Sequence, residues 1–94
     1  MVITLDEACN VLHVDRGADD ILIDSLIDAV GPYIEATTGL PEALQDGDPL
    51  CVTVAGFLLT QWYYGDHADD RALKRTSDAL LKVITIRARD IQTE

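Results

Sequence analysis

The feature of this sequence that most constrains its fold is the segment 49–64, which is apolar at nearly every position. Asp48 and Pro49 at its start form a helix start signal, with the aspartate as the capping residue and the proline at the first helical position. The β-branched residues of the segment also suit a strand, but its length and the pair Ala55-Gly56 favour a helix. A helix that is hydrophobic all round is normally central, so we expect the other segments to surround it.

Two helices are expected before this segment. Thr4 and Glu7 have the spacing of a capping box, so a first helix opens at Thr4 and carries its apolar stripe as far as Leu12. A second, long helix starts around Asp19 and Asp20, where carboxylates meet the positive end of the helix dipole. Both helices are expected to pack an apolar stripe against the central segment.

The second helix has a clear end and an irregular interior. Gly39, followed by Pro41, is a typical stop signal. Gly31-Pro32 interrupts the interior, and because Pro32 cannot donate a hydrogen bond to the carbonyl of Asp28, we expect a kink or a break there. The residues predicted to face the core share one stripe: Ile23, Leu26, Ile27, Val30 and Ile34.

The rest of the chain is expected to form loops and a last helix. Residues 40–49 suit a loop with room for one short turn, and residues 65–70 suit a second loop. A short helical turn over 71–75 precedes the last helix, which starts at Thr76 or Ser77 as the cap. Its predicted core stripe is Leu80, Val83, Ile84, Arg87 and Ile91. The chain of 94 residues is thus predicted to be a single all-α domain, a small bundle of four to five helices with a long second helix and a central apolar helix.

The charge of the chain is strongly negative and unevenly distributed. Its formal net charge of -10 disfavours a basic groove that binds nucleic acid, and it disfavours anionic membrane surfaces. Residues 1–70 hold fourteen acids and one base, Arg16, whereas residues 71–94 hold six bases and three acids. The basic C-terminal part can pack against the acidic remainder of the same chain, or it can contact the acidic face of another copy, head to tail. Charge alone favours the first of these interpretations.

The cysteines and the N-terminus indicate a protein that folds inside the cell. Cys9 and Cys51 both fall within apolar-periodic stretches, so we expect two small buried thiols in a reducing compartment. The N-terminus shows no basic region of a secretory signal, and the longest apolar stretch, 50–64, is too short to span a bilayer.

A catalytic site is not expected. The only serines, Ser25 and Ser77, do not lie in a nucleophile elbow, and the glycines do not form a phosphate-binding loop. The residues that could serve a metal-dependent hydrolase are His13, Asp15, His67 and Asp70. Because acids near loops usually cap helices and face water, the sequence predicts no catalytic, cofactor-binding or metal-binding residue, and no enzyme.

The aromatic residues are concentrated at the end of the central segment, in Trp62-Tyr63-Tyr64. Three consecutive residues of a helix cannot all face the same way. They either fill the core with one tyrosine partly exposed, or they form a hot spot of a protein–protein interface, where Trp and Tyr are enriched.

The order of the short motifs resembles that of the small head–tail connector proteins of tailed bacteriophages, which are also described as DNA-packaging or adaptor proteins. The resemblance covers nearly the whole chain, except that Gly31-Pro32 departs from the continuous helix expected there and the last twenty residues match weakly. It is carried by these segments in order: Thr4-Leu-Asp-Glu-Ala8, Leu12-His-Val-Asp15, Asp19-Asp20, Leu26-Ile27-Asp-Ala29, Tyr33-Ile-Glu35, Thr38-Gly39, Trp62-Tyr63-Tyr64, Ala79-Leu80-Leu81 and Arg87.

The resemblance implies a structural virion protein without enzymatic activity. In that family, many copies form a ring beneath the portal protein, and here we expect about a dozen copies. The protein is expected in the host cytoplasm during assembly and then at the capsid–tail junction of the virion. The ring extends the channel for DNA, which passes without specific binding, and offers a surface to head-completion or tail-terminator proteins. The expected subunit-interface residues are Arg71, Lys74, Arg75, Trp62, Tyr63 and Tyr64. The expected channel-lining residues, whose carboxylates would repel phosphate, are Asp19, Asp20, Asp24 and Asp28.

An alternative from another class is a small acidic helical module that binds proteins, either as a DNA mimic or by sequestering a basic partner. A stable monomer or dimer that captures a basic protein would distinguish this module from a ring-forming connector.

Overall fold

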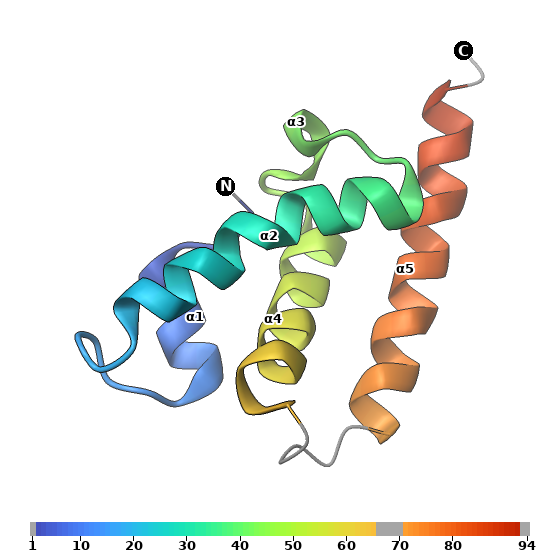
Figure 1. Cartoon of the computed structure of the whole chain (residues 1–94). Coiled ribbons are helices and arrows are strands. Elements are labelled where there is room, and N and C mark those ends of the chain that lie inside the picture. The colour runs from blue at the N-terminus through green and yellow to red at the C-terminus, as the bar shows by residue number, and fades with distance from the viewer. Residues whose placement is uncertain (1, 66–70, 93–94) are drawn as a thin grey trace.

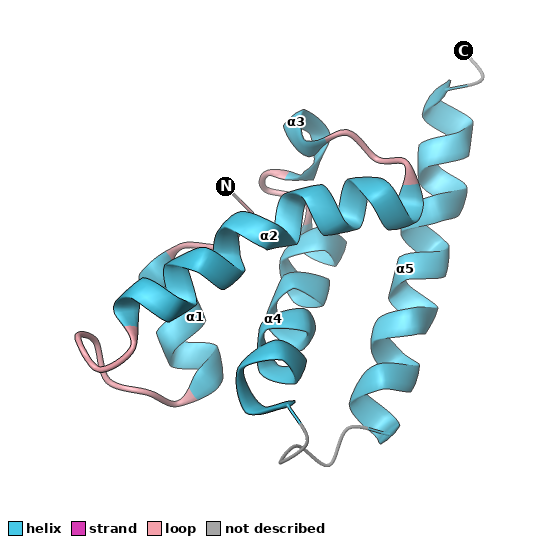
Figure 2. Cartoon of the chain, viewed as in Figure 1, coloured by secondary structure: helices cyan, strands magenta, loops and turns pink. Residues whose placement is uncertain are grey.

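A computed structural model describes residues 2–65 and 71–92, and these residues form an all-helical bundle (Figures 1 and 2). Within them there are five helices and no strand, which confirms the predicted fold class. The helices are α1 (Leu5–Leu12), α2 (Asp20–Thr38), α3 (Glu42–Gln45), α4 (Pro49–Tyr64) and α5 (Arg71–Gln92). In Figure 1, α4 lies between α1 and α5, and α2 crosses in front of it.

The apolar segment forms α4 and occupies the centre, as its composition predicts. Helix α4 packs against α1, α2 and α5, and its side chains at Cys51, Val54 and Leu59 are completely buried. The other helices supply the remainder of one continuous hydrophobic cluster, which includes Leu12, Ile23, Ile34 and Ile84. A helix that contacts neighbours on several sides needs apolar residues on several sides, which explains why α4 has no polar face over most of its length.

The predicted helix boundaries are confirmed at three places. Glu7 donates its backbone N–H to Thr4 Oγ1 at 3.2 Å, and Thr4 donates its own to Glu7 Oε1 at 3.1 Å, which completes the capping box of α1. Asp48 Oδ1 accepts the backbone N–H of Leu50 at 2.9 Å and so caps α4. Gly39 ends α2 with φ of 85°, in the left-handed region that glycine adopts without strain.

The break expected at Gly31-Pro32 is wrong, because α2 runs through both residues as one helix. Pro32 lies on the exposed side of α2, and Asp28, whose carbonyl loses its usual donor, is exposed as well. A proline on the exposed side of a helix costs less than one on the buried side, because water can reach the backbone groups there. On the opposite side, Val30 and Ile34 are buried, so core packing holds the helix together on both sides of the proline.

The start and the core stripe predicted for the last helix are also partly wrong. Helix α5 begins at Arg71, so the turn expected over 71–75 is its first part, and Ser77 is buried in its interior rather than acting as a cap. Val83 and Ile91, predicted to be buried, are 44% and 47% exposed. The buried face consists of Ser77, Leu81, Ile84 and Ala88. Its two small residues were not predicted because they contribute little to a hydrophobic stripe.

Candidate interaction surfaces

The three aromatic residues at the end of α4 are turned toward the rest of the chain. Tyr63 donates its hydroxyl to Asp19 Oδ2, and Tyr64 donates its hydroxyl to the backbone carbonyl of Leu12. Trp62 packs edge-on against Tyr33 of α2, with the ring centroids 5.3 Å apart. Of the two interpretations of this cluster, the described contacts favour a core role with partly exposed rings. All three residues keep some surface, with Tyr64 37% exposed.

The hydrogen bond between Tyr63 and Asp19 also affects the chemistry of the tyrosine. The bond to the Asp19 carboxylate, together with burial, raises the pKa of Tyr63 to about 12. The hydroxyl therefore stays protonated and remains a donor over the whole physiological range. Asp19, predicted to line a channel, is instead a half-buried acceptor that connects the start of α2 to the end of α4.

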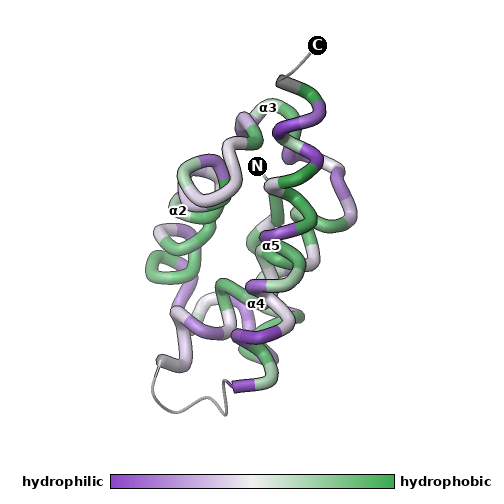
Figure 3. The backbone as a smooth tube through the Cα atoms, turned by 90° about the vertical axis from the view of Figure 1, so that its right-hand side faces the viewer, coloured by the Kyte–Doolittle hydropathy of each residue, from purple (hydrophilic) through white to green (hydrophobic). Residues whose placement is uncertain are grey.

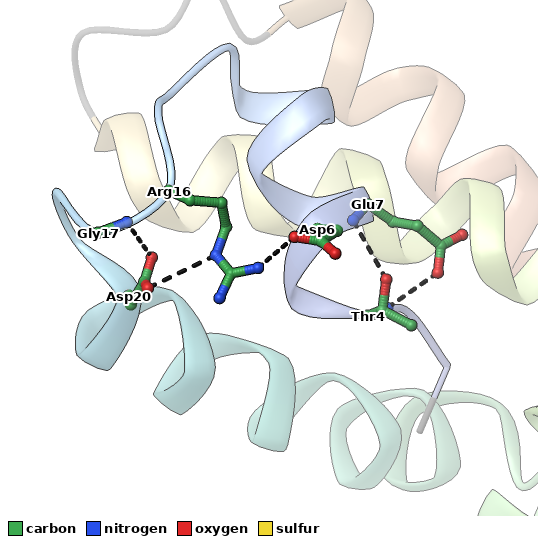
Figure 4. Close-up of polar contacts among 6 residues, drawn as sticks. All are labelled: Thr4, Asp6, Glu7, Arg16, Gly17 and Asp20. Atoms are coloured by element: carbon green, nitrogen blue, oxygen red, sulfur yellow. Dashed lines mark hydrogen bonds and ion pairs between the residues drawn. The ribbon is translucent and has the colours of Figure 1, made fainter.

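Asp20, the second predicted channel residue, also has partners within the chain (Figure 4). Its Oδ1 accepts the backbone N–H of Gly17 at 2.8 Å, and its Oδ2 lies 3.5 Å from Nε of Arg16. Arg16 also bonds Asp6 through its Nη1, and this bond raises the pKa of the guanidinium above its ordinary value. The one base of the first 70 residues thus bridges α1 and the start of α2.

Asp24 and Asp28, the other two predicted channel residues, are exposed on α2. Neither makes an ion pair or a side-chain hydrogen bond within residues 2–65 and 71–92. Glu35 is exposed too. It lies on the same side of α2 as Asp24 and Asp28, because the three residues follow the spacing i, i+4, i+11. One oxygen of Glu35 accepts the backbone N–H of Glu42 at 3.0 Å and so holds α3 against α2.

Most bases of the C-terminal part remain unpaired on the surface of α5. Arg71, Lys74 and Arg75 are exposed and, with Asp78, Ala79 and Lys82, line an open hollow along the first half of the helix. In the part of the chain that the structure describes, these four bases form no ion pair. The packing of basic residues against acids of the same chain, favoured by charge alone, is therefore not seen for this half of α5.

Arg87 of α5 forms an ion pair with Asp48, the residue that caps the start of α4. Its Nη2 lies 2.8 Å from Oδ2 of Asp48, whose side chain is only 10% exposed. Burial opposes ionisation of Asp48, but its hydrogen bonds from Arg87, Leu50 and Cys51 outweigh burial and hold its pKa below the ordinary value. Asp48 thus caps α4 and anchors α5 with the same carboxylate.

Sequence reasoning missed a second apolar stripe on each of the two long helices. On α5, the outward-facing residues Ala72, Ala79, Val83 and Ile86 are exposed, with Ile86 at 57%. On α2, the exposed residues Leu22, Ala29, Tyr33 and Ala36 follow the same spacing of i, i+7, i+11, i+14, with Leu22 at 51%. The signal was present in the sequence, because each helix carries more apolar residues than one buried face can hold.

No metal or nucleophile site emerges from the described residues. Among them, no group of three or more His, Cys, Asp or Glu side chains is placed to hold a metal ion. His13 ends α1 in the left-handed conformation, and Asp15 is exposed in the following loop. His67 and Asp70 lie outside the described residues. Cys9 and Cys51 are free, buried thiols, as predicted.

A small acidic hollow lies between α2 and α3. It is lined by Val2, Ile27, Asp28, Gly31, Glu42, Ala43 and Asp46. Beside it, Gln45 is fully buried and donates its side-chain amide to the carbonyls of Gly31 and Leu40, at 3.1 and 2.9 Å. These bonds fix the short helix α3 on α2, so the hollow is a product of this local packing.

Comparison with known proteins adds no relative. No protein-family model matches the chain, and neither a curated protein nor a solved structure matches it significantly. Among the described residues, no helix combines the length and the apolar character needed to cross a membrane.

Proposed function

We propose that this chain is a structural connector of a tailed bacteriophage, whose copies form a ring of about a dozen subunits beneath the portal protein. The ring would extend the DNA channel at the capsid–tail junction and present its other face to a head-completion or tail-terminator protein. The proposal assigns the chain no reaction, cofactor or metal.

The observation that carries this proposal is the separation of charge on the folded chain. Four bases of α5 (Arg71, Lys74, Arg75 and Lys82) are exposed and form no ion pair among residues 2–65 and 71–92, while the first 70 residues carry fourteen acids and one base. Two such surfaces on one molecule favour a heterologous, head-to-tail contact, which generates a closed ring when the rotation closes. The order of short motifs along the chain supports the same class of protein.

An acidic ring also suits a passage for DNA, because carboxylates repel phosphates and do not retain the duplex. Asp24 and Asp28 are exposed, and so they are available for such a lining or for a contact with another copy. Asp19 and Asp20 are engaged by Tyr63 and by Arg16, which makes them less suited to the lining.

The proposal is tested by native mass spectrometry over a range of protein concentrations, combined with negative-stain images of any large species. We expect a closed ring with an open centre wide enough for duplex DNA, formed by the chain alone or on a portal ring. A chain that stays a monomer or dimer with and without a portal, and that captures a basic protein, would instead support the acidic binding module.

A further inference from the structure

The outer surface of α5, on the side away from the core, carries two parallel rows of exposed residues. The first row is apolar except for Thr76, and the next position of its pattern, Asp90, ends it. This apolar row consists of Ala72, Thr76, Ala79, Val83 and Ile86. The second row is basic and consists of Arg75, Lys82 and Arg89. Figure 3 looks onto α5 and shows hydrophobic and hydrophilic residues alternating along it.

The spacing of the two rows is that of a helix that packs along another helix. Residues of the apolar row are separated alternately by four and three positions, which is the heptad pattern. The three bases recur every seven positions, so they border the apolar row along one edge. In paired helices, charges at such bordering positions determine which partner is accepted. The outer surface of α5 is therefore suited to a helix with acidic residues along the matching edge.

A second copy of α5 is not that helix. Two α5 helices in antiparallel orientation would bring the basic rows against each other, and like charges there oppose association. In parallel orientation the basic row would face the other edge of the apolar row. That edge consists of Leu73, Leu80 and Arg87 and holds no acid.

The other described helices of the chain do not offer an acidic counterpart either. On α2, the acids Asp28 and Glu35 lie on the side that faces α3, away from the exposed apolar residues Leu22 and Tyr33. Helices α1 and α3 have eight and four residues, too few to cover an apolar row of about 21 Å. Helix α4 is enclosed by α1, α2 and α5. The matching helix therefore belongs to another protein.

We infer that the outer surface of α5 is a docking site for an acidic amphipathic helix of another protein. The aliphatic residues of that helix pack on the apolar row, where Val83 and Ile86 are 44% and 57% exposed. Its carboxylates pair with the basic row, beside which an open hollow lined in part by Arg75 and Lys82 gives them room. These two bases form no ion pair within residues 2–65 and 71–92, so docking breaks no contact already made by them.

The same bases could meet the phosphates of a nucleic acid, but the surroundings favour an acidic helix. A phosphate backbone leaves the apolar row in water, whereas an amphipathic helix covers it. Asp78 also lines the basic hollow, and the net charge of -10 repels a long polyanion more than a short helix with a few acids.

This docking site goes beyond the proposed ring and does not depend on it. Arg71 and Lys74 lie outside the two rows, so they remain available for a contact between copies. Arg75, predicted at the subunit interface, is instead assigned to the other protein.

The test uses two synthetic peptides, each three heptads long, with leucine at the positions that face α5. They differ only at the bordering positions, which hold Glu in one peptide and Lys in the other, so like charges keep each peptide from pairing with itself. Fluorescence anisotropy of each labelled peptide, titrated with the full chain, measures the binding. We expect the Glu peptide to bind at least about tenfold more tightly, because only its charges complement those of α5.

Two double variants test the two rows separately. Arg75→Glu with Lys82→Glu should reverse the preference, so that the Lys peptide binds more tightly. Val83→Ser with Ile86→Ser should weaken binding of the Glu peptide by at least about threefold, because less apolar surface is buried. All four residues are exposed, so both variants are expected to fold, and circular dichroism checks this.

The matched control compares two lysines of α5, both exposed and without an ion pair among the described residues. Lys82→Glu should weaken binding of the Glu peptide, whereas Lys74→Glu, outside both rows, should leave the preference for that peptide in place. Binding of neither peptide, equal binding of both, or equal effects of the two lysine variants would overturn the inference. A short duplex DNA that displaces the Glu peptide at an equal or lower concentration would overturn it too, because the surface would then serve a nucleic acid.

Discussion

The body formed by α1, α2 and α4 and the C-terminal helix α5 are held in different ways. In the body, polar side chains join one segment to another, with Arg16 bridging Asp6 and Asp20 and Tyr63 bonding Asp19. Helix α5 is joined by an apolar seam and by the ion pair of Arg87 with Asp48. The body thus uses much of its polar chemistry internally, whereas α5 keeps most of its charges exposed. The difference shows that polar links between segments are concentrated in the body, whereas α5 depends mainly on apolar packing.

The largest expected effect comes from the centre of the body. Leu59→Ala removes a fully buried side chain of α4 and should lower the free energy of unfolding by about 2–5 kcal/mol, through lost burial and the cavity left behind. Its counterpart on α5 is Ile86→Ala, which should change that free energy by less than about 0.5 kcal/mol because Ile86 is mostly exposed. Urea unfolding of both variants measures the contrast. Equal losses at the two positions would contradict the division between a packed body and an exposed outer surface of α5.

The next effect concerns the carboxylate that connects the two regions. Asp48→Ala removes the cap of α4 and should cost about 1 kcal/mol, whereas Asp48→Asn keeps an acceptor for the cap and should cost less. Because the folded pKa of Asp48 is below 3.8, its contribution is fully present above that pH and is lost as the pH falls through the folded value. Thermal unfolding between neutral pH and pH 2 should therefore show an acid-dependent loss that is reduced in Asp48→Asn. An unchanged acid profile in that variant would show that the ion pair with Arg87 contributes nothing.

A gain in stability is expected where the body has space. The Cβ of Gly56→Ala would meet Val11 Cγ1 at 3.5 Å, an ordinary van der Waals contact. Because alanine is the better helix former, the variant should be more stable by up to about 1 kcal/mol in urea unfolding. Gly47→Ala is the control and should be destabilised, because its φ of 77° disfavours an L side chain. A loss of stability in Gly56→Ala would mean that α1 and α4 pack more tightly than this contact indicates.

The smallest expected effect is the loss of a single hydroxyl. Tyr63→Phe keeps the ring but removes the hydrogen bond to Asp19, so the start of α2 should exchange its amide hydrogens faster while the core stays protected. In the unmodified chain, the pKa raised from 10.0 to about 12 means that this stabilisation is complete below pH 10 and is lost as the pH rises toward 12. Alkaline unfolding should be less steep in Tyr63→Phe. Identical exchange and alkaline profiles in the two proteins would exclude a role for this bond.

The parts of the fold that the sequence predicts well are those with local signals. The capping box at Thr4, the Asp48-Pro49 start and the stop at Gly39 each satisfy backbone groups within a few residues, so no distant contact is needed to recognise them. The position of α4 follows similarly, because its composition leaves no face for water. Of the candidate site residues, Arg71, Lys74 and Arg75 are exposed, and their role as subunit contacts stays a prediction.

The features that the sequence does not predict depend on competition between segments far apart in the chain. Helix α5 has two apolar stripes, and the one containing the small residues Ser77 and Ala88 is buried, although the one containing Val83 and Ile86 is more hydrophobic. Small residues allow closer packing of helices, which a count of hydrophobic residues does not include. The bond of Tyr63 to Asp19 spans 44 positions, and no local pattern indicates it.

The two buried cysteines provide a means to observe how the molecule opens. Cys9 lies in the short helix α1 and Cys51 in the first turn of the central helix α4. Burial raises the pKa of both thiols, that of Cys51 to about 11, so neither reacts readily while its helix is in place. The rate of alkylation at each thiol therefore reports the opening of a different region, without any introduced label. If α1 detaches while the core stays closed, Cys9 will be modified first, and the interval before modification of Cys51 will measure how far the two events are separated.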